Sequence, residues 1–453
     1  VLVAPLLAWP TGASMSPKIP VILGGLERFE QFDMAERNPP AARQEGISDG
    51  ERTHTPGLTP PRDTASPATP PHPAGGQPDG MAAFPPRAVA APEQGTTSPV
   101  PSPAFAGKAA RAGAPYRQSY AAIDLGTNNC RLLIARPSGD TFVVVDAFSR
   151  VVRLGEGLAQ TGMLSEAAME RAVGALRICA EKLKRRNVHL ARSVATEACR
   201  RASNGAQFIE RVRQETGIML DIISAREEAR LAVLGCHILL EQGDGPAMIF
   251  DIGGGSTELV LIEPGAPVPE IMDWQSVPWG VVSLTETVGD EHATREGRLA
   301  RYAEMRRLVT ESFAPFAQRI ASHQTPDLRL LGTSGTVTTL ASLHLNLPQY
   351  DRRAVDGLIV PASSMRDISL NLSGMSPDER RTLPCIGNER ADLVVAGCAI
   401  LESILDIWPA TRLGVADRGI REGILRSLMS ADVEGTVMRE SLRRGKHQSR
   451  HET

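Results

Sequence analysis

The sequence predicts an α/β protein made of two domains that share one plan, preceded by a disordered extension. Three observations lead to this fold class. Prolines gather in the first quarter of the chain, and short β-rich runs alternate with amphipathic helical segments after it. In addition, a strand that ends in Asp and runs into a glycine-containing turn occurs twice. Alternation of strands and helices is typical of α/β domains.

Residues 1–116 are predicted to be disordered. Of the 34 prolines, 21 precede Arg117, and Ser, Thr, Gly and Ala fill the intervals between them. Such a composition buries too little apolar surface to offset the conformational entropy of the chain. The apolar residues 1–9 lack a basic leader and are too short to span a bilayer, which disfavours a signal peptide. Because the chain opens with valine and has Met15, Met34 and Met81 further on, part of this extension could precede the true start of the protein.

Composition limits the classes of function. The net charge of −3 gives no overall basic field, so no specific nucleic-acid partner is expected and a polyanion would need a local site. No later apolar run reaches membrane length, so no membrane partner is expected either. The cysteines form no C-x-x-C pair, which argues against a zinc site and for reduced thiols in a cytoplasmic protein. They are Cys130, Cys179, Cys199, Cys236, Cys385 and Cys398.

The first domain, expected over residues 117–242, reads as β-β-β-α-β-α-β-α. Apolar and β-branched runs between turn residues indicate its strands, and apolar residues at helical spacing after Ser165 indicate its first helix, with Ser165 as N-cap. Gly217 is expected to close the second helix, and Ser224 to begin the third. The predicted strands are 121–124, 130–135, 142–145, 188–195 and 218–223, and the later helices are 206–215 and 224–241.

The second domain, expected over residues 243–430, begins with the same kind of unit. After Gly243-Asp-Gly245 the predicted strands are 247–251, 258–262 and a third around 270–272, followed by a long helix at about 295–321, a strand at 328–331 and further helices. The last helix could pack back on the first domain. Residues 431–453 are expected to form a flexible tail.

Two corresponding corners, Asp124-Leu-Gly-Thr127 and Asp251-Ile-Gly-Gly254, suggest an interdomain phosphate-binding cleft. A turn that carries glycine and hydroxyl or amide residues directs backbone N–H groups at one point, which suits an anion. Two such turns on facing domains would hold one phosphate chain from both sides, with an Asp beside each turn for a divalent cation. A glycine-rich hairpin more often serves only chain geometry, but the repetition of Asp-x-Gly in both halves favours phosphate binding.

Other phosphate and hydrolase motifs are absent or misplaced. The chain has no G-x-x-x-x-G-K-[ST] loop, and Gly253-Gly-Gly255 lacks the third glycine of a dinucleotide fingerprint. A G-x-S-x-G match at residues 46–50 lies in the extension, without the strand-to-helix turn that a nucleophilic serine needs. We interpret it as a chance match.

Six motifs in order resemble the exopolyphosphatase/guanosine pentaphosphate phosphatase (Ppx/GppA) family, within the actin-like (ribonuclease H-like) ATPase superfamily. The resemblance covers about residues 118–430 and implies two actin-like domains. It also implies the short form without a C-terminal HD-type domain, because few residues follow Ser430. The motifs are Asp124-Leu-Gly-Thr-Asn-Asn-Cys-Arg131, Ala195-Thr-Glu-Ala-Cys-Arg200, Ser224-Ala-Arg-Glu-Glu-Ala-Arg230, Phe250-Asp-Ile-Gly-Gly-Gly-Ser-Thr-Glu258, Gly332-Thr-Ser-Gly-Thr336 and Asp417-Arg-Gly-Ile-Arg-Glu-Gly423.

The resemblance implies roles for individual residues. Glu228 is the expected base for water, with Asp251 and Glu258 as further catalytic residues, and Asp251 and Asp124 would hold Mg²⁺ or another divalent cation. By default a Glu near a helix N-terminus only complements the helix dipole, an interpretation that fits Glu227 better. Arg131 is a weaker candidate than Arg200 for holding the phosphate chain. The expected phosphate-binding residues are Gly126, Thr127, Asn128, Arg200, Gly254, Gly255 and Ser256.

The implied function is a cytoplasmic phosphohydrolase that releases terminal orthophosphate from inorganic polyphosphate or from guanosine pentaphosphate (pppGpp) by metal-assisted attack of water. Both substrates end in the same phosphoanhydride, so the preference between them stays open. Two alternatives would use the same pair of phosphate-binding turns: an actin-like kinase or ATPase, and a non-catalytic alarmone-binding regulator. The resemblance also suggests a homodimer, which the sequence itself does not indicate.

Overall fold

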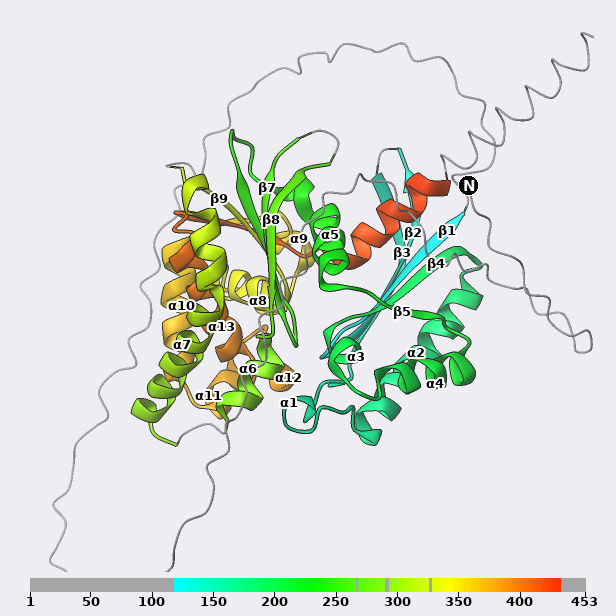
Figure 1. Ribbon diagram of the computed structural model, residues 1–453, viewed down its shortest axis with the longest axis horizontal. Coiled ribbons are helices and arrows are strands. Elements are labelled where there is room, and N and C mark those ends of the chain that lie inside the picture. The colour runs from blue at the N-terminus through cyan, green and yellow to red at the C-terminus, as the bar shows by residue number, and fades with distance from the viewer. Residues whose placement is uncertain (1–117, 140, 266–267, 290–292, 326–327, 433–453) are drawn as a thin grey trace, which may run out of the picture. The chain divides into compact units, whose positions relative to one another are not determined.

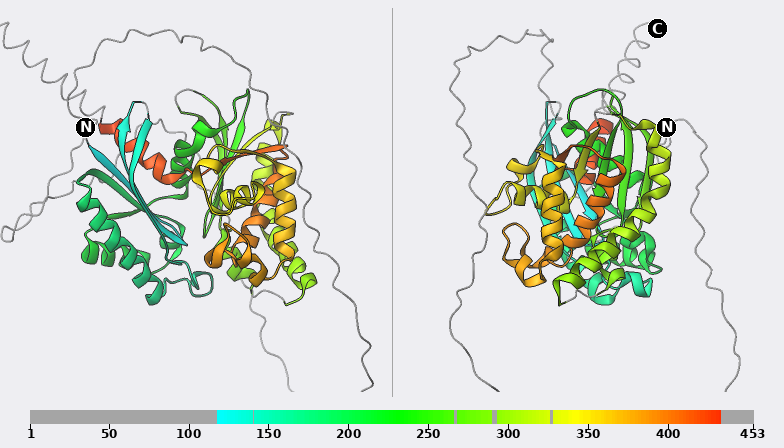
Figure 2. Two further views of the ribbon diagram at one scale, coloured as in Figure 1. Left: turned by 180° about the vertical axis from the view of Figure 1, so that it is seen from behind. Right: turned by 90° about the vertical axis from the view of Figure 1, so that its left-hand side faces the viewer.

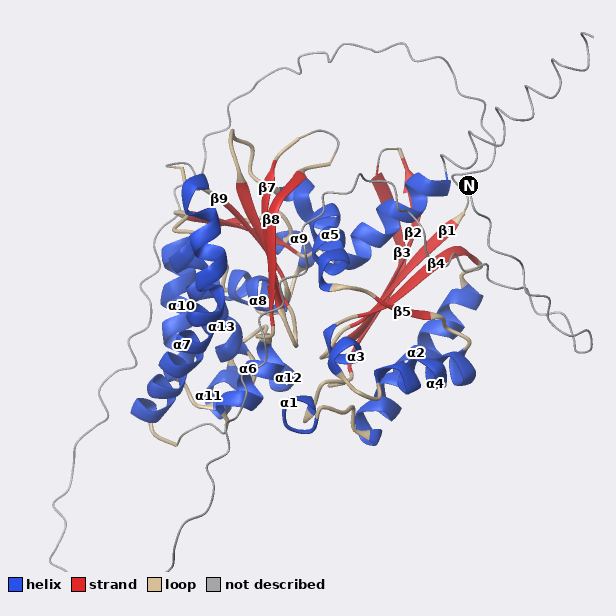
Figure 3. Cartoon of the chain, viewed as in Figure 1, coloured by secondary structure: helices blue, strands red, loops and turns tan. Residues whose placement is uncertain are grey.

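Two mixed β-sheets with helices packed against them make up the described part of the chain, as the computed structural model shows (Figures 1 and 3). This arrangement confirms the predicted α/β class. The predicted extension lies outside the described residues, as does most of the predicted tail, although residues 431 and 432 are still helical. The described residues are 118–139, 141–265, 268–289, 293–325 and 328–432.

The first sheet has the strand order β3-β2-β1-β4-β5. Its first three strands form an antiparallel meander, and β4 and β5 add in parallel on the other side of β1. The prediction placed these strands correctly, but β3 is longer than expected and β5 shorter. Their bounds are β1 Ser119–Leu125, β2 Asn129–Ser138, β3 Thr141–Val151, β4 Val188–Ala195 and β5 Leu220–Ile222.

The helix ends at Ser165, Gly217 and Ser224 lie where the sequence predicts them, whereas α1 and α3 were not predicted. Ser165 accepts a hydrogen bond from the N–H of Ala168 at the start of α2, and Gly217 closes α4 in a left-handed conformation. The predicted helix 224–241 is too long, because α5 ends at Cys236 and a tighter 3₁₀ turn leads toward the next strand. The bounds are α1 Leu158–Thr161, α2 Glu166–Arg185, α3 Glu197–Arg201, α4 Gly205–Thr216, α5 Ala225–Cys236 and η2 His237–Leu239.

The second sheet repeats the plan of the first, with the order β10-β11-β9-β6-β7-β8. Here β6, β7 and β8 form the antiparallel meander, and β9 pairs with β6 in parallel as β4 does with β1. The predicted third strand is only the start of β8, and β10 and β11 had not been predicted. The bounds are β6 Ala247–Ile252, β7 Thr257–Glu263, β8 Glu270–Val277, β9 Arg329–Thr333, β10 Ile359–Pro361 and β11 Arg412–Ala416.

Most helices of the second half cover the face of the second sheet that carries Phe250 and Leu259, in one large apolar core. The predicted boundary between 242 and 243 falls in the connection from η2 to β6, and it stays a prediction. The bounds are α6 Val281–Val288, α7 Arg295–Ile320, η3 Ala321–His323, α8 Gly335–His344, α9 Arg352–Val355, α10 Ala362–Gly374, α11 Pro377–Thr382, α12 Gly387–Arg390 and α13 Val394–Ile407.

Helix α5 lies between the two sheets. Leu231 and Ala232 belong to the apolar cluster on one face of the first sheet, whereas Ala229 and Val233 belong to a cluster on the second sheet. The final helix, residues 420–432, also packs on that face of the first sheet, as both views of Figure 2 agree. The described helices are each too short or too polar to span a bilayer.

Candidate active site

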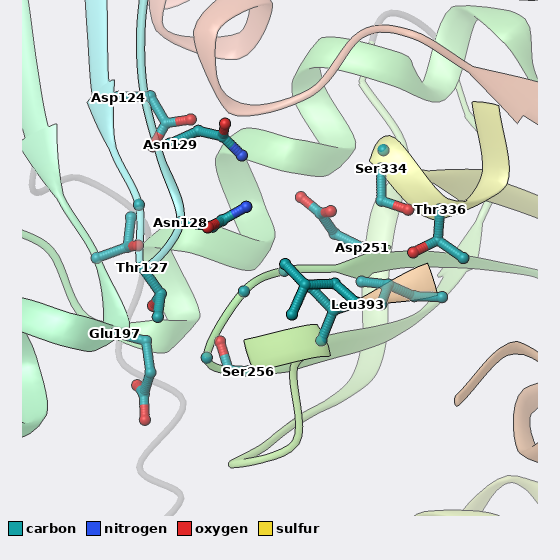
Figure 4. Close-up of a pocket in the computed structure, with 18 of the residues that line it drawn as sticks. Asp124, Thr127, Asn128, Asn129, Glu197, Asp251, Ser256, Ser334, Thr336 and Leu393 are labelled. Atoms are coloured by element: carbon teal, nitrogen blue, oxygen red, sulfur yellow. The ribbon is translucent and has the colours of Figure 1, made fainter. Parts of the chain in front are cut away.

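A pocket opens where β1 and β6 end in their turns. Figure 4 shows Thr127 and Asn128 on one wall, Asp251 and Ser256 across from them, and Ser334 beyond. Every predicted site residue except Arg200 lines this pocket. Those residues are Asp124, Gly126, Thr127, Asn128, Glu228, Asp251, Gly254, Gly255, Ser256 and Glu258.

The two turns have the same geometry and touch each other. Gly126 N–H donates to Asn129 O and Gly253 N–H donates to Ser256 O, both at 2.9 Å. A Cβ on Gly254 would lie 3.1 Å from Asn128 N, and a Cβ on Gly255 would lie 2.6 Å from Thr127 Oγ1. The second turn therefore needs glycine so that the first turn can approach it.

Carbonyl groups in both turns are hydrogen-bonded away from the pocket. Val152 and Gly155 donate to Asn128 O and Thr127 O, at 2.8 and 2.9 Å. In the second turn, Gly253 O and Gly254 O accept from the first N–H groups of α6, and Ser283 Oγ donates to Gly255 O at 3.0 Å.

The matching N–H groups are left without protein acceptors. This holds for the N–H groups of Thr127, Asn128, Gly254, Gly255 and Ser256 with respect to all described residues. The two turns therefore offer a set of unpaired donors that suits a bound phosphate.

The strand next to each turn carries a pair of charged residues. Asp124 is directly opposite Arg131 in the first hairpin, and Asp251 is directly opposite Glu258 in the second. Glu258 is only 2 % exposed, and its Oε1 accepts hydrogen bonds from Ser256 and Ser276, each at 2.8 Å. Its side chain is therefore buried in the pocket wall and does not face outward from the hairpin.

Burial and mutual repulsion raise the pKa values of the carboxyl groups in the pocket, which favours their protonated forms. Burial, followed by the charges of Glu258 and Asp124, raises the pKa of Asp251 to about 8. Burial is also the largest cause that raises the pKa values of Asp124, Glu228 and Glu258. The charge of Arg131 counteracts the shift at Asp124 and Asp251, and the charge of Arg200 counteracts it at Glu228 and Glu258.

Glu228 stands in the first turn of α5 and is 7 % exposed. Its Oε2 accepts a hydrogen bond from Arg200 Nη1 at 3.0 Å, and no described residue hydrogen-bonds to its Oε1. By contrast, the neighbouring Glu227 forms ion pairs with Arg192 and Arg230. Of these two glutamates, only Glu228 lines the pocket.

Arg200 contacts Glu228 but does not itself line the pocket. Its Nη1 also donates to Ile223 O at 2.8 Å, and its Nε and Nη2 donate to Glu197 Oε2 at 3.0 and 2.6 Å. Its contacts within the described residues are therefore to a backbone carbonyl and two carboxylates, and its role in holding phosphate stays a prediction.

Several lining residues were not assigned a role from the sequence. Arg390 lines the pocket and donates from Nη1 to Thr339 Oγ1 at 2.8 Å, and it forms no ion pair with any described residue. Ser334 is the N-cap of α8, with a φ of 147°, and it lines the pocket together with Thr336. The motif that contains Ser334 and Thr336 was a signal for this wall, whereas Arg390 has no local signal.

Two carboxylates of the pocket suit a divalent cation such as Mg²⁺. Among the described residues, no group of three or more His, Cys, Asp or Glu side chains is arranged to hold a metal ion. Asp124 and Asp251 nevertheless line one pocket, and the pKa of each is raised, chiefly because the surrounding protein desolvates its charge. Mg²⁺ commonly binds through one or two carboxylates together with water and substrate phosphates, so this donor set suits it better than it suits a metal held by protein ligands alone.

Comparison with known proteins gives consistent matches. Residues 133–432 match the Ppx/GppA phosphatase family. The chain is 31% identical over 323 residues to exopolyphosphatase 2 of Mycobacterium tuberculosis, covering 68% of this chain and 98% of that protein. It is similar to the solved structure of the Aquifex aeolicus Ppx/GppA family member, with 28% identity, a TM-score of 0.56, and coverage of 70% and 98%. An exopolyphosphatase from Cytophaga hutchinsonii matches with 25% identity, a TM-score of 0.63, and coverage of 69% and 98%.

Proposed function

This chain belongs to the Ppx/GppA phosphatase family and has its two-domain actin-like fold, and we propose that it releases terminal orthophosphate from inorganic polyphosphate. One observation carries the proposal: Glu228 exposes an oxygen without a protein partner in a pocket that is walled by two turns with unpaired N–H groups. A base beside an oriented set of donors is what hydrolysis of a phosphoanhydride requires.

The terminal phosphoryl group binds between the turns. The N–H groups of Thr127, Asn128, Gly254, Gly255 and Ser256 donate to its oxygens, and Arg131 provides a positive charge in the same pocket. Preorganised donors of this kind stabilise the charge that develops on a transferring phosphoryl group.

Glu228 accepts the proton of the attacking water through Oε1. The water oxygen bonds to the terminal phosphorus, the bridging P–O bond breaks, and the shortened chain leaves as its own phosphate anion. The raised pKa of Glu228 makes its carboxylate a stronger base than an exposed glutamate. Asp124 and Asp251 would hold Mg²⁺, which neutralises phosphate charge when it is bound.

The test is phosphate release from polyphosphate in the presence of Mg²⁺. Glu228→Gln is expected to lower kcat by roughly 100-fold or more, in the range of general-base removal. Glu227→Gln is the matched control, because it neutralises the adjacent surface carboxylate. Absence of phosphate release by the wild-type protein, or equal rates for the two variants, would contradict the proposal.

Guanosine pentaphosphate is the second candidate substrate, since it ends in the same anhydride. Beyond the turns the pocket continues to Ser334, Thr336 and Arg390, which leaves polar surface for groups behind the terminal phosphate. A side-by-side measurement of kcat/KM for polyphosphate chains of several lengths and for guanosine pentaphosphate decides between them. Sugar-dependent formation of ADP from ATP would instead favour a kinase, and tight nucleotide binding without turnover would favour a regulator.

A further inference from the structure

Arg200 is shared between two carboxylates that reach it from different helices. Glu197 is the first residue of α3 and holds the Nε and Nη2 side of the guanidinium, whereas Glu228 of α5 meets only Nη1. The Glu197 side chain is 14 % exposed, so this contact is largely shielded from water. We propose that Glu197 is a positioning residue that restricts Arg200 to a single hydrogen bond with Glu228 and thereby leaves Glu228 Oε1 available to water.

The geometry of an arginine–carboxylate pair explains why such a restriction is needed. An arginine with only one carboxylate within reach prefers to bind both of its oxygens through two parallel N–H groups. In that arrangement both oxygens of Glu228 would be covered by Arg200. Glu197 prevents this because its Oε2 already accepts hydrogen bonds from Nε and from Nη2.

Two further contacts fix Glu197 and Arg200 in place. Arg200 Nη1 also donates to Ile223 O, just before α5, which sets the position of the guanidinium relative to Glu228. On the other side, a Cβ on Gly255 would lie 3.0 Å from Glu197 Cγ, so the Glu197 side chain packs against the second phosphate turn. Glu197 therefore connects the phosphate-binding turn with the pair formed by Arg200 and Glu228.

This inference rests on the proposed function, in which Glu228 is the base. Glu197→Ala is expected to lower kcat by roughly 10- to 100-fold, the scale of a misplaced catalytic group, while KM changes by less than about threefold. Glu197→Gln, which keeps an acceptor oxygen for Arg200, is expected to fall between Glu197→Ala and the wild-type protein.

The matched control is Glu210→Ala. Glu210 holds Arg213 in α4 with the same spacing of three residues and also accepts from Nε and Nη2, but neither residue lines the pocket. Its kcat is expected to stay at the wild-type value. An equal fall in kcat for Glu210→Ala and Glu197→Ala would overturn the proposal.

A double-mutant cycle shows whether Glu197 acts through Arg200. Lysine at position 200 cannot contact both carboxylates through a planar fork. In an Arg200→Lys background, Glu197→Ala is therefore expected to change kcat by less than about twofold. If Glu197→Ala lowers kcat by the same factor in both backgrounds, Glu197 acts independently of Arg200 and the proposal is wrong.

A crystal structure of Glu197→Ala separates this inference from the proposed function. We expect Arg200 to contact both oxygens of Glu228 in that variant. If the wild-type protein hydrolyses no phosphoanhydride, the proposed function fails, and this structure still tests the positioning. A guanidinium that stays on Glu228 Oε2 alone would overturn the inference.

Discussion

Asp251 and Glu258 are directly opposite each other across the β6–β7 hairpin. Like charges in this relationship destabilise a sheet, and here Glu258 is buried and Asp251 is half-buried. The corresponding pair in the first hairpin, Asp124 and Arg131, has opposite charges. The second hairpin therefore carries an electrostatic strain that the fold itself does not require, and bound cations would relieve it.

We predict that Asp251→Asn stabilises the protein at alkaline pH. The pKa of Asp251 is raised from 3.8 to about 8 in the folded state. Between these two values the folded state holds a proton that the unfolded state has lost, so stability falls as pH rises from about 4 to about 8. Asparagine removes this loss, and the gain in unfolding free energy is expected to grow across that window, by at most roughly 1.4 kcal/mol per pH unit.

Urea unfolding at several pH values, in the presence of a chelator, checks this prediction. The exposed Asp244 gives the control variant Asp244→Asn, which makes the same change in net charge. A difference between Asp251→Asn and the wild-type protein that stays constant from pH 4 to pH 8 would show that Asp251 is ionised throughout the folded state.

The site could be predicted from the sequence where its residues are local in the chain. The first phosphate turn is a run of three residues and the second a run of four, each between two short strands, and Asp-x-Gly occurs at the end of the first strand in both halves. Such features depend on backbone conformation, which glycine and the neighbouring strand residues determine. The resemblance supplied Glu228, since nothing in its local pattern distinguishes it from Glu227.

The rest of the site depends on contacts between distant segments. Arg200 meets Glu228 because α3 and α5 follow adjacent parallel strands, and its pairing with two carboxylates could not be read from either motif. Helix α6 is eight residues long, too short for its periodicity to distinguish a helix from a strand. Arg390 comes from the four-residue helix α12, which has no recognisable pattern.

Gly280→Ala is expected to disturb the second phosphate turn. A Cβ on Gly280 would lie 2.3 Å from the carbonyl carbon of Gly254, so either the turn or α6 must move. Overpacking of this kind destabilises proteins by about 1–3 kcal/mol. KM for polyphosphate is also expected to rise, because the N–H groups of the turn shift. Thermal unfolding and steady-state kinetics measure both effects.

Gly174→Ala is the control for that substitution. Gly174 lies inside α2, and a Cβ there would meet no atom within 4 Å. Alanine in a helix interior is more favourable than glycine by about 0.5–1 kcal/mol, so this variant is expected to be slightly stabilised with unchanged kinetics. If Gly280→Ala has the same unfolding temperature and the same kinetic constants as Gly174→Ala, the tight contact at Gly280 is contradicted.

Arg390→Ala is expected to weaken substrate binding. Arg390 lines the pocket without an ion pair to any described residue, so its charge is available to a substrate phosphate. Charge-assisted hydrogen bonds contribute about 1.5–3 kcal/mol, which corresponds to a rise in KM of roughly tenfold or more. Arg353→Ala removes the same charge from an exposed position outside the pocket, and similar KM values for the two variants would exclude the role.

The crossing of α5 with the last helix predicts a long-range effect on Glu228. A Cβ on Gly423 would lie 2.0 Å from Leu231 O, and Leu231 is one turn beyond Glu228 in α5. Gly423→Ala must therefore separate the two helices and displace α5 from the sheets that hold it. We expect a loss of about 1–3 kcal/mol in unfolding free energy.

Because α5 carries the proposed base, Gly423→Ala should also lower kcat at temperatures where the variant is fully folded. Circular dichroism establishes that temperature range, and phosphate release from polyphosphate is then measured within it. A variant that is destabilised but keeps the wild-type kcat would show that the position of Glu228 does not depend on the helix crossing.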